Sequence, residues 1–169
     1  MKPKGLKTRI FLDSGNPDET REALRLLGFL DGQTTNPTLI SKNPDARERL
    51  NRGLKFTRKE LLHLYRVVVN EISGLIPEGS VSIEVYADLS TPAEQMLEQG
   101  REMVTWIPNA HIKFPSAREG LKAAEEAVKE RIRVNMTLCF TQKQAAAIYA
   151  ATRGAARGDV FVSPFIGRL

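Results

Sequence analysis

Cysteine is nearly absent from this chain of 169 residues, which contains only Cys139. A lone cysteine excludes an intramolecular disulfide and fits a reducing compartment. Long apolar runs are also missing, and no stretch approaches the uninterrupted length of a membrane span. The basic start, MKPKGLKTRI, is not followed by the apolar region of a secretory signal. From these absences we expect a cytoplasmic protein with no membrane partner.

The composition is that of an ordinary globular domain, with 41% hydrophobic and 27% charged residues. The length allows one domain with a sizeable core. The net charge of +5 raises nucleic acid as a partner, but the basic residues are spread along the chain instead of being clustered with aromatics. The densest basic run, residues 47–59, is typical of a solvated helical face. We therefore expect no nucleic-acid partner, and small anionic substrates would use the same charge.

Strand-like and helical segments alternate along the chain. The strand-like segments are 8–13, 30–36, 80–86, 110–115, 132–138 and 159–165. The helical segments are 16–28, 58–73, 91–106, 116–130 and 141–154, with a further short helix expected within 41–57. This alternation predicts an α/β fold, a parallel sheet with helices on its faces. The pattern fits both an open doubly wound sheet and a β/α barrel, and both place their chemistry at the carboxyl ends of the strands.

Helix boundary signals accompany two of these segments. Asn16 followed by Pro17 predicts a helix start, and Gly28 predicts its end. Ser116 and Glu119 have the spacing of a capping box, so we expect Ser116 to cap the helix that follows it.

Polar side chains recur toward the carboxyl end of every predicted strand. In chain order they are Asp13, Asn36, Glu84, Lys113, Asn135 with Thr137, and Ser163. Because the carboxyl ends of parallel strands meet at one rim, these residues are candidates for a single site. Some have a simpler structural explanation: Asp13, with Ser14 and Asn16, can shape the turn into the next helix, and Asn36 before a proline is a common turn residue.

Lys113 lies in the short apolar run AHIKFP, where burial of an unpaired ammonium is strongly unfavourable. It is either a surface lysine that snorkels from an edge strand or an amine that its site keeps neutral by desolvation. A neutral amine can attack a carbonyl. His111 is on the same strand face, and we expect it to fill the interior.

Four motifs stand out along the chain: DGQTTNPTLI (31–40), HIKFP (111–115), IRVNMTLCF (132–140) and VSPFIGRL (162–169). In their order and spacing they resemble the motifs of the transaldolase family. The resemblance runs from about Ile10 to the last residue. It implies a TIM-type (β/α) barrel of the class I aldolase kind, which acts through a lysine Schiff base and uses neither a metal nor an organic cofactor.

The resemblance implies catalytic roles for four residues. Lys113 matches the Schiff-base lysine. Asp13 matches the carboxylate that takes the proton of the C4 hydroxyl as the C3–C4 bond breaks. Glu84 matches an acid/base that, with Thr137 and a held water, moves protons while the carbinolamine forms and dehydrates.

The resemblance also implies a set of substrate-binding residues. Asn36 and Asn135 match amides that hold hydroxyls of the dihydroxyacetone unit. Ser163 and Phe165 match positions beside the donor sugar, and Arg168 matches an arginine that binds the substrate phosphate, a task for which its planar fork is suited.

The activity implied is transfer of a dihydroxyacetone unit from fructose 6-phosphate or sedoheptulose 7-phosphate to an aldose phosphate, a reaction of the pentose phosphate pathway. One alternative is an enzyme that releases dihydroxyacetone to water, like the related fructose-6-phosphate aldolases. Those typically have glutamine in place of Glu84 and tyrosine in place of Phe165, so the two residues favour transfer. A second alternative is an inactive truncated remnant that keeps the motifs by descent.

Two features depart from the family pattern. Arg131 stands where a glycine usually precedes the strand, and an arginine in a positive-φ turn would cost on the order of 1 kcal/mol.

The sequence ends just after the sixth predicted strand, whereas a complete barrel has eight strands and about 250 residues. We therefore expect residues 1–169 to form a single domain, an incomplete barrel without strands 7 and 8. We also expect the chain either to be a fragment or to form a homo-oligomer through its open strand edges.

Overall fold

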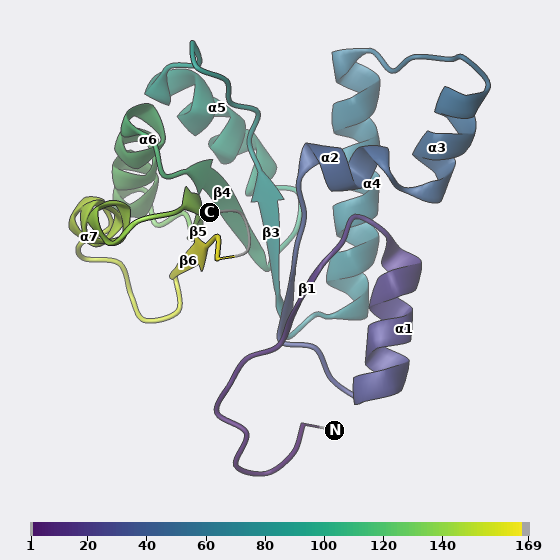
Figure 1. The fold of residues 1–169 in the computed structure, drawn as a ribbon, viewed down its shortest axis with the longest axis horizontal. Coiled ribbons are helices and arrows are strands. Elements are labelled where there is room, and N and C mark those ends of the chain that lie inside the picture. Colours follow the sequence, from purple (N-terminus) through teal and green to yellow (C-terminus); the bar gives the residue numbers. More distant parts are fainter. Residues whose placement is uncertain (1, 167–169) are drawn as a thin grey trace. The chain divides into compact units, whose positions relative to one another are not determined.

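The structure, a computed structural model, describes residues 2–166, in which six strands alternate with seven helices (Figure 1). The strands are β1 (Phe11–Asp13), β2 (Gly32–Thr34), β3 (Ser80–Glu84), β4 (Ala110–Pro115), β5 (Val134–Cys139) and β6 (Val160–Pro164). The helices are α1 (Pro17–Leu27), α2 (Pro37–Ser41), α3 (Pro44–Asn51), α4 (Arg58–Leu75), α5 (Ala93–Met103), α6 (Arg118–Lys129) and α7 (Gln142–Ala151). No helix within residues 2–166 combines the length and apolar character that a membrane crossing requires.

The strand order decides between the two folds that the sequence pattern allows. In the sheet the order is β1-β2-β3-β4-β5-β6, the same as along the chain. The pairs β1/β2, β2/β3, β4/β5 and β5/β6 are parallel. A doubly wound sheet reverses its strand order at a switch point, whereas a β/α barrel keeps the order of the chain. The architecture is therefore that of an incomplete TIM-type β/α barrel, as predicted.

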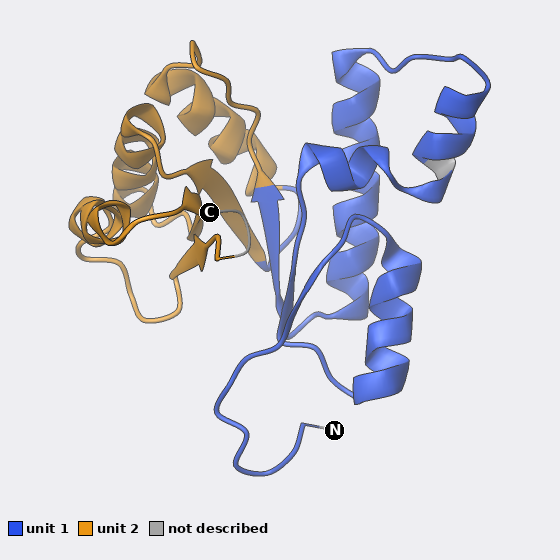
Figure 2. Cartoon of the chain, viewed as in Figure 1, with its two compact units in different colours: residues 1–83, 106–109 blue, residues 84–105, 110–169 orange. Residues whose placement is uncertain are grey.

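The chain divides into two compact units, coloured separately in Figure 2. Unit 1 comprises residues Met1–Ile83 and Trp106–Asn109, and unit 2 comprises Glu84–Thr105 and Ala110–Leu169. Each unit is described by itself below.

Unit 1 has its core between the strands and the long helix α4. The side chains of Tyr65, Val69 and Ile72 on α4 are almost completely buried. Tyr65 packs edge-on against Trp106, with 6.1 Å between the ring centroids, and its hydroxyl lies 2.7 Å from Oγ1 of Thr35. The buried tyrosine thus keeps a polar partner for its hydroxyl, as such residues usually do.

Unit 2 contains the most deeply buried strand of the described chain. Every residue of β4 except Pro115 is buried. Helix α6 approaches the end of this strand so closely that a Cβ on Gly120 would lie 2.0 Å from the carbonyl oxygen of Pro115. A glycine at this point therefore allows α6 to pack against the end of β4.

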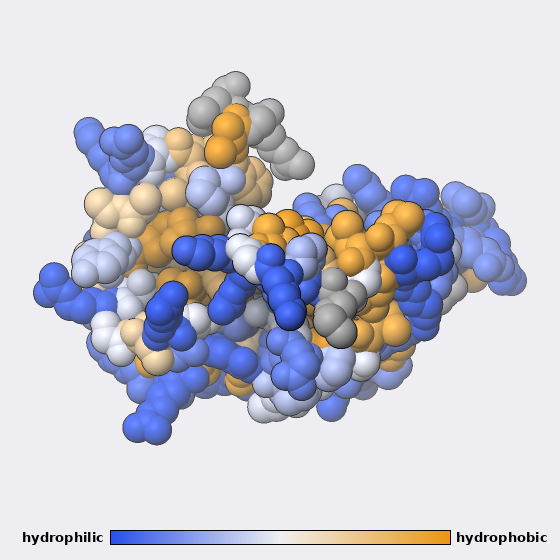
Figure 3. All heavy atoms as spheres, turned by 90° about the horizontal axis from the view of Figure 1, so that it is seen from below, coloured by the Kyte–Doolittle hydropathy of each residue, from blue (hydrophilic) through white to orange (hydrophobic). Residues whose placement is uncertain are grey.

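Apolar side chains also remain at the surface, where Figure 3 shows them among hydrophilic ones. The most exposed are Leu26, Leu89, Tyr149 and Ile166. Single exposed apolar residues are normal, but Val162 is also 41% exposed on β6, a strand at one end of the described sheet.

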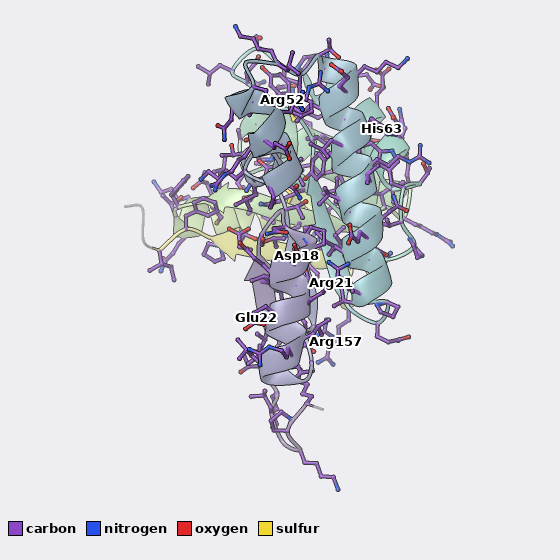
Figure 4. The ribbon with its side chains drawn as sticks, turned by 90° about the vertical axis from the view of Figure 1, so that its right-hand side faces the viewer. Asp18, Arg21, Glu22, Arg52, His63 and Arg157 are labelled. Atoms are coloured by element: carbon purple, nitrogen blue, oxygen red, sulfur yellow. The ribbon has the colours of Figure 1, made fainter. Side chains whose placement is uncertain are left out.

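The outer face of α1 and α4 is held by ion pairs. Arg21 contacts Asp18 within α1 at 2.8 Å and Glu71 on α4 at 2.5 Å. Asp18, Arg21 and Glu22 all project from α1 in Figure 4. Such exposed pairs contribute little individually, although the contact to Glu71 joins two helices that lie far apart in sequence.

The predicted helix start and stop at α1 are confirmed. Asn16 caps the helix by accepting a hydrogen bond from the Asp18 amide, Pro17 is its first residue, and Gly28 ends it with φ of 72°. The predicted capping box at α6 is wrong. The N-cap is Ala117, with no side-chain cap, because the Ser116 hydroxyl donates to the carbonyl of Thr137 instead.

Candidate active site

Lys113 is buried in the middle of β4, with 5% of its surface exposed. The backbone of Lys113 has a neighbour on each side. Its carbonyl accepts a hydrogen bond from the amide of Val85, just after β3, and its register partner on β5 is Asn135. β4 is thus an interior strand of the described sheet. These facts exclude a surface lysine that snorkels from an edge strand.

The ammonium of Lys113 is paired with the carboxylate of Glu84, the last residue of β3. Nζ lies 3.0 Å from Oε2, and the two side chains are 6% and 24% exposed. A carboxylate at this distance offsets the desolvation of the ammonium. It is also close enough to exchange a proton with the amine directly.

Asn135 and Ser163 meet on the neighbouring strands β5 and β6. The Ser163 hydroxyl donates to Oδ1 of Asn135 at 2.8 Å, which fixes the orientation of that amide. Asn135 is 1% exposed and lies directly across from Lys113 in the β4/β5 register. Three of the predicted site residues, Lys113, Asn135 and Ser163, therefore lie on three consecutive strands of unit 2.

Thr137 lies two residues beyond Asn135, so the two side chains leave the same face of β5, and Thr137 is 1% exposed. The chain is irregular immediately after it. Leu138 has φ of 58°, and the register against β6 shifts between Met136 and Cys139. Positive φ in a leucine costs on the order of 1 kcal/mol, and such strain often accompanies functional sites.

Phe165 lies just beyond β6. Its amide donates to the carbonyl of Cys139 at 2.9 Å, and its ring packs edge-on against Phe140, with 5.3 Å between centroids. Cys139 itself is a buried free thiol. Arg168, the predicted phosphate-binding arginine, lies outside the described residues.

Asp13 and Asn36 belong to unit 1. Asp13 ends β1 with an exposed side chain, whose Oδ1 accepts from the Thr34 hydroxyl at 2.6 Å. Of the three residues that could shape the turn into α1, Ser14 and Asn16 do so: the Ser14 hydroxyl accepts from the Asn16 amide, and Asn16 caps the helix, whereas the hydrogen bond of Asp13 goes to Thr34.

Asn36 does have the structural role that the sequence allows. It is the N-cap of α2, and its Oδ1 accepts from the amide of Leu39 at 2.8 Å. Because that bond uses the amide oxygen, any hydrogen bond of Asn36 to a substrate hydroxyl would come from its NH2 group.

His111 has a packing role in unit 2. It is 3% exposed, stacks on Phe161 with 4.4 Å between ring centroids, and contacts the carbonyl of Gly158 through Nε2 at 3.0 Å. The prediction that it fills the interior is thus supported by its burial.

An ordered loop that belongs to none of the four motifs follows Glu84. The carboxylate of Asp88 accepts from the hydroxyl and amide of Ser90, the hydroxyl of Thr91 and the hydroxyl of Tyr86. These hydrogen bonds, that of the Ser90 hydroxyl first, hold the pKa of Asp88 well below its usual range. The recognisable signal is an aspartate followed two and three residues later by hydroxyl side chains.

Metal ligands are not assembled in the part of the chain that the structure describes. Within residues 2–166, no group of three or more His, Cys, Asp or Glu side chains is placed to hold a metal ion.

The fold and the site together define a class of protein. A parallel β/α sheet in chain order, with a buried lysine paired to a carboxylate at the end of the preceding strand, is typical of β/α-barrel enzymes that act through a lysine amine. A family model described as Transaldolase/Fructose-6-phosphate aldolase matches residues 10–169. The chain belongs to this family, which confirms the resemblance inferred from its motifs.

Several curated relatives carry the name "Probable transaldolase". The protein of Dehalococcoides mccartyi is 43% identical over 161 residues, which are 95% of this chain and 62% of the relative. That of Desulforudis audaxviator is 44% identical over 160 residues, 95% of this chain and 61% of the relative. The protein of Heliobacterium modesticaldum is 42% identical over 161 residues, which are 95% of this chain and 61% of the relative. The chain thus spans about three fifths of the length of these relatives.

Proposed function

We propose that this chain carries the active site of a transaldolase. It would transfer a dihydroxyacetone unit from a ketose phosphate, fructose 6-phosphate or sedoheptulose 7-phosphate, to an aldose phosphate through a Schiff base on Lys113. The observation that carries the proposal is the buried ion pair of Lys113 with Glu84 at 3.0 Å. The proposal takes residues 1–169 as a single transaldolase-like domain that acts in the cytoplasm, in the pentose phosphate pathway, and needs no metal or organic cofactor.

The first step is proton exchange within the ion pair. An ammonium has no lone pair, so Lys113 must give a proton to Glu84 before Nζ can attack the C2 carbonyl of the sugar. Attack forms a carbinolamine. Its hydroxyl leaves as water when Glu84 returns a proton, with Thr137 assisting through a held water, and an iminium remains.

Carbon–carbon cleavage follows from the iminium. The iminium withdraws electrons from the C3–C4 bond, so cleavage leaves an enamine on Lys113 instead of a carbanion. Asp13 takes the proton of the C4 hydroxyl as that bond breaks, and the aldose phosphate departs. The same steps in reverse attach the dihydroxyacetone unit to the acceptor.

Substrate binding is assigned to the remaining candidates. Asn36 and Asn135 would hold the hydroxyls of the dihydroxyacetone unit, and Ser163 and Phe165 would line the donor sugar. Arg168 would bind the phosphate through its planar fork.

Trapping of the Schiff base tests the mechanism directly. The protein is incubated with fructose 6-phosphate and borohydride, and the reduced adduct is mapped by mass spectrometry. We expect a single adduct on Lys113, none in Lys113→Arg, and an unchanged yield in Lys122→Arg, which alters an exposed lysine. A folded protein without an adduct on Lys113 would contradict the proposed mechanism.

The family also includes aldolases, so release of dihydroxyacetone to water is the second candidate function. Phe165 favours transfer, because a phenylalanine ring has no hydroxyl with which to place a water. The edge-on packing of this ring against Phe140 is consistent with an apolar role. Product formation is compared with and without erythrose 4-phosphate as acceptor. Equal rates of donor cleavage in the two reactions would favour the aldolase.

A further inference from the structure

Gln144, the third residue of α7, joins three segments of unit 2 through its side-chain amide. Its oxygen Oε1 accepts from the amides of Phe140 at 2.9 Å and Thr141 at 3.1 Å. Its nitrogen Nε2 donates to the carbonyls of Ser116 at 3.1 Å and Leu138 at 3.3 Å. Both halves of one amide are therefore engaged, one by the start of α7 and the other by the ends of β4 and β5.

The carbonyls held by Nε2 flank the proposed reaction centre. Ser116 follows β4 three residues after Lys113, and Leu138 follows Thr137 directly. The carbonyl of Thr137 accepts in turn from the amide of Ser116 at 2.8 Å and from its hydroxyl at 2.6 Å. These bonds tie the end of the lysine-bearing strand to the end of the threonine-bearing strand.

The backbone at this point requires such support. Leu138 adopts φ of 58°, and the register of β5 against β6 shifts there. A strained residue keeps its conformation only where the surroundings over-determine it. If Leu138 relaxed into the ordinary strand conformation, the peptide group between Thr137 and Leu138 would rotate, and the carbonyl of Thr137 would lose its bonds to Ser116.

Helix capping does not account for the whole contact. Gln144 forms a capping box with Thr141, but only Oε1 takes part in it. The same position in the capping box of α4 is occupied by Glu60, whose carboxylate has no N–H group. The capping box of α4 is thus complete without an NH2 group. The two hydrogen bonds that Nε2 of Gln144 donates are therefore not needed to cap α7, and they serve another purpose.

We propose that Gln144 is a positioning residue, whose NH2 group holds the ends of β4 and β5 so that Lys113 and Thr137 act on the same substrate. The inference rests on the proposed Schiff-base function. It adds a residue that touches no substrate and acts through the backbone of Ser116 and Leu138.

The substitution Gln144→Glu separates positioning from capping. The introduced carboxylate still accepts from the amides of Phe140 and Thr141, but it presents an oxygen to the two carbonyls that Nε2 now holds. We expect the circular dichroism spectrum to be retained. We expect the maximal rate of reductive trapping with fructose 6-phosphate to fall by roughly 10- to 100-fold, with a much smaller change in the half-saturating concentration.

The pH dependence gives a signature that a purely structural role would not produce. Below about pH 4 the introduced carboxyl is protonated and regains a donor for one of the carbonyls. With cyanoborohydride as the reductant, the ratio of the unaltered rate to the Gln144→Glu rate should therefore shrink as the pH is lowered. A ratio independent of pH would overturn the proposal.

Thr141→Ala is the matched control, because it removes the hydroxyl of the capping box and leaves both bonds of Nε2 in place. Thr141→Ala should lower the melting temperature but leave the trapping rate within about twofold of the unaltered protein. We expect the same result for Glu60→Gln, which alters the capping box of α4. If Thr141→Ala slows trapping as much as Gln144→Glu, or if Gln144→Glu traps at the unaltered rate, Gln144 is only a cap. If Gln144→Glu fails to fold, the bonds of Nε2 serve the stability of the fold and not positioning. If the unaltered protein traps no adduct, the proposed function fails instead.

Discussion

The Lys113–Glu84 contact contains the most buried cation among the salt bridges of the described residues. The Lys113 side chain is 6% exposed, whereas the next most buried cation in these pairs, Lys2, is 29% exposed. The carboxylate that compensates the buried charge is also the acceptor for the proton that the amine must lose in the proposed mechanism. One carboxylate therefore serves both the burial of Lys113 and the first step of the proposed reaction.

Arg131 provides a stability prediction at the scale of one residue. Its φ is 62°, so the positive-φ turn anticipated from the sequence is confirmed. Arg131→Gly removes the steric penalty, while glycine gains flexibility in the unfolded chain. We expect a net increase of about 0.5–1 kcal/mol in the free energy of unfolding, measured by urea denaturation.

Arg131→Ala is the appropriate control, since it removes the guanidinium but keeps the Cβ that causes the penalty. No gain in stability is expected for it. An equal gain in the two variants would show that the charge, not the backbone conformation, is responsible.

The sequence predicts some site residues and misses others for identifiable reasons. Lys113 is conspicuous because a charge interrupts an apolar strand, but the same pattern allows a surface lysine, and only the position of β4 inside the sheet decides between the two. The strained Leu138 is not conspicuous, because a leucine in an apolar run carries no signal of positive φ. Gln144 looks like any polar residue in the first turn of a helix, and only the folded chain shows which carbonyls its amide reaches. The Ser116 hydroxyl likewise bonds a neighbouring strand in place of the predicted helix cap.

At the scale of elements, the alternating pattern predicts the helices and strands better than their ends. Each predicted strand overlaps an observed one, yet the predicted strand 8–13 corresponds only to Phe11–Asp13 and 30–36 only to Gly32–Thr34. Strand ends are set by pairing with neighbours, which no local pattern contains. The pattern predicts no helix at α2, which is only five residues long, and α3 is the short helix expected within 41–57.

The capping box of α4 makes the stability of that helix depend on pH. The pKa of Glu60 is lowered to about 2, first by the hydrogen bond from the Thr57 amide and then by Arg49 and the Thr57 hydroxyl. Because the folded pKa lies below the unfolded value of 4.5, the stabilisation is fully present above that pH and is lost as the pH falls toward 2. The stability difference between the unaltered protein and Glu60→Gln should therefore shrink across this range in thermal melts.

Arg49→Met tests the cause. Removal of the guanidinium should raise the folded pKa of Glu60, so that the stabilisation disappears at a higher pH than in the unaltered chain. A stability difference that stays constant between pH 5 and about 2 would contradict this account of the cap.

At the scale of the whole molecule, the last strand of the described sheet predicts self-association. β6 pairs with β5 on one side, and Val162 on this strand is 41% exposed. Unpaired strand edges are templates for pairing with another chain, and a lysine on such an edge suppresses it. We expect the protein to form dimers or larger species in light scattering and Val162→Lys to shift it toward the monomer.

Val67→Lys is the control for that substitution, because Val67 is similarly exposed, at 48%, but lies on α4. It should leave the molar mass unchanged. A monomeric unaltered protein, or an equal effect of the two substitutions, would argue against association through β6.

The burial of Lys113 has a practical consequence for attaching this protein to a surface. Of the ten lysines, Lys113 alone is buried, and the others are exposed or partly exposed. Bulky amine-directed coupling reagents, such as activated esters on a polymer bead, will therefore react with the outer lysines first. The chain could be immobilised through ordinary amine coupling with its nucleophile intact, and no protecting ligand would be needed during the reaction.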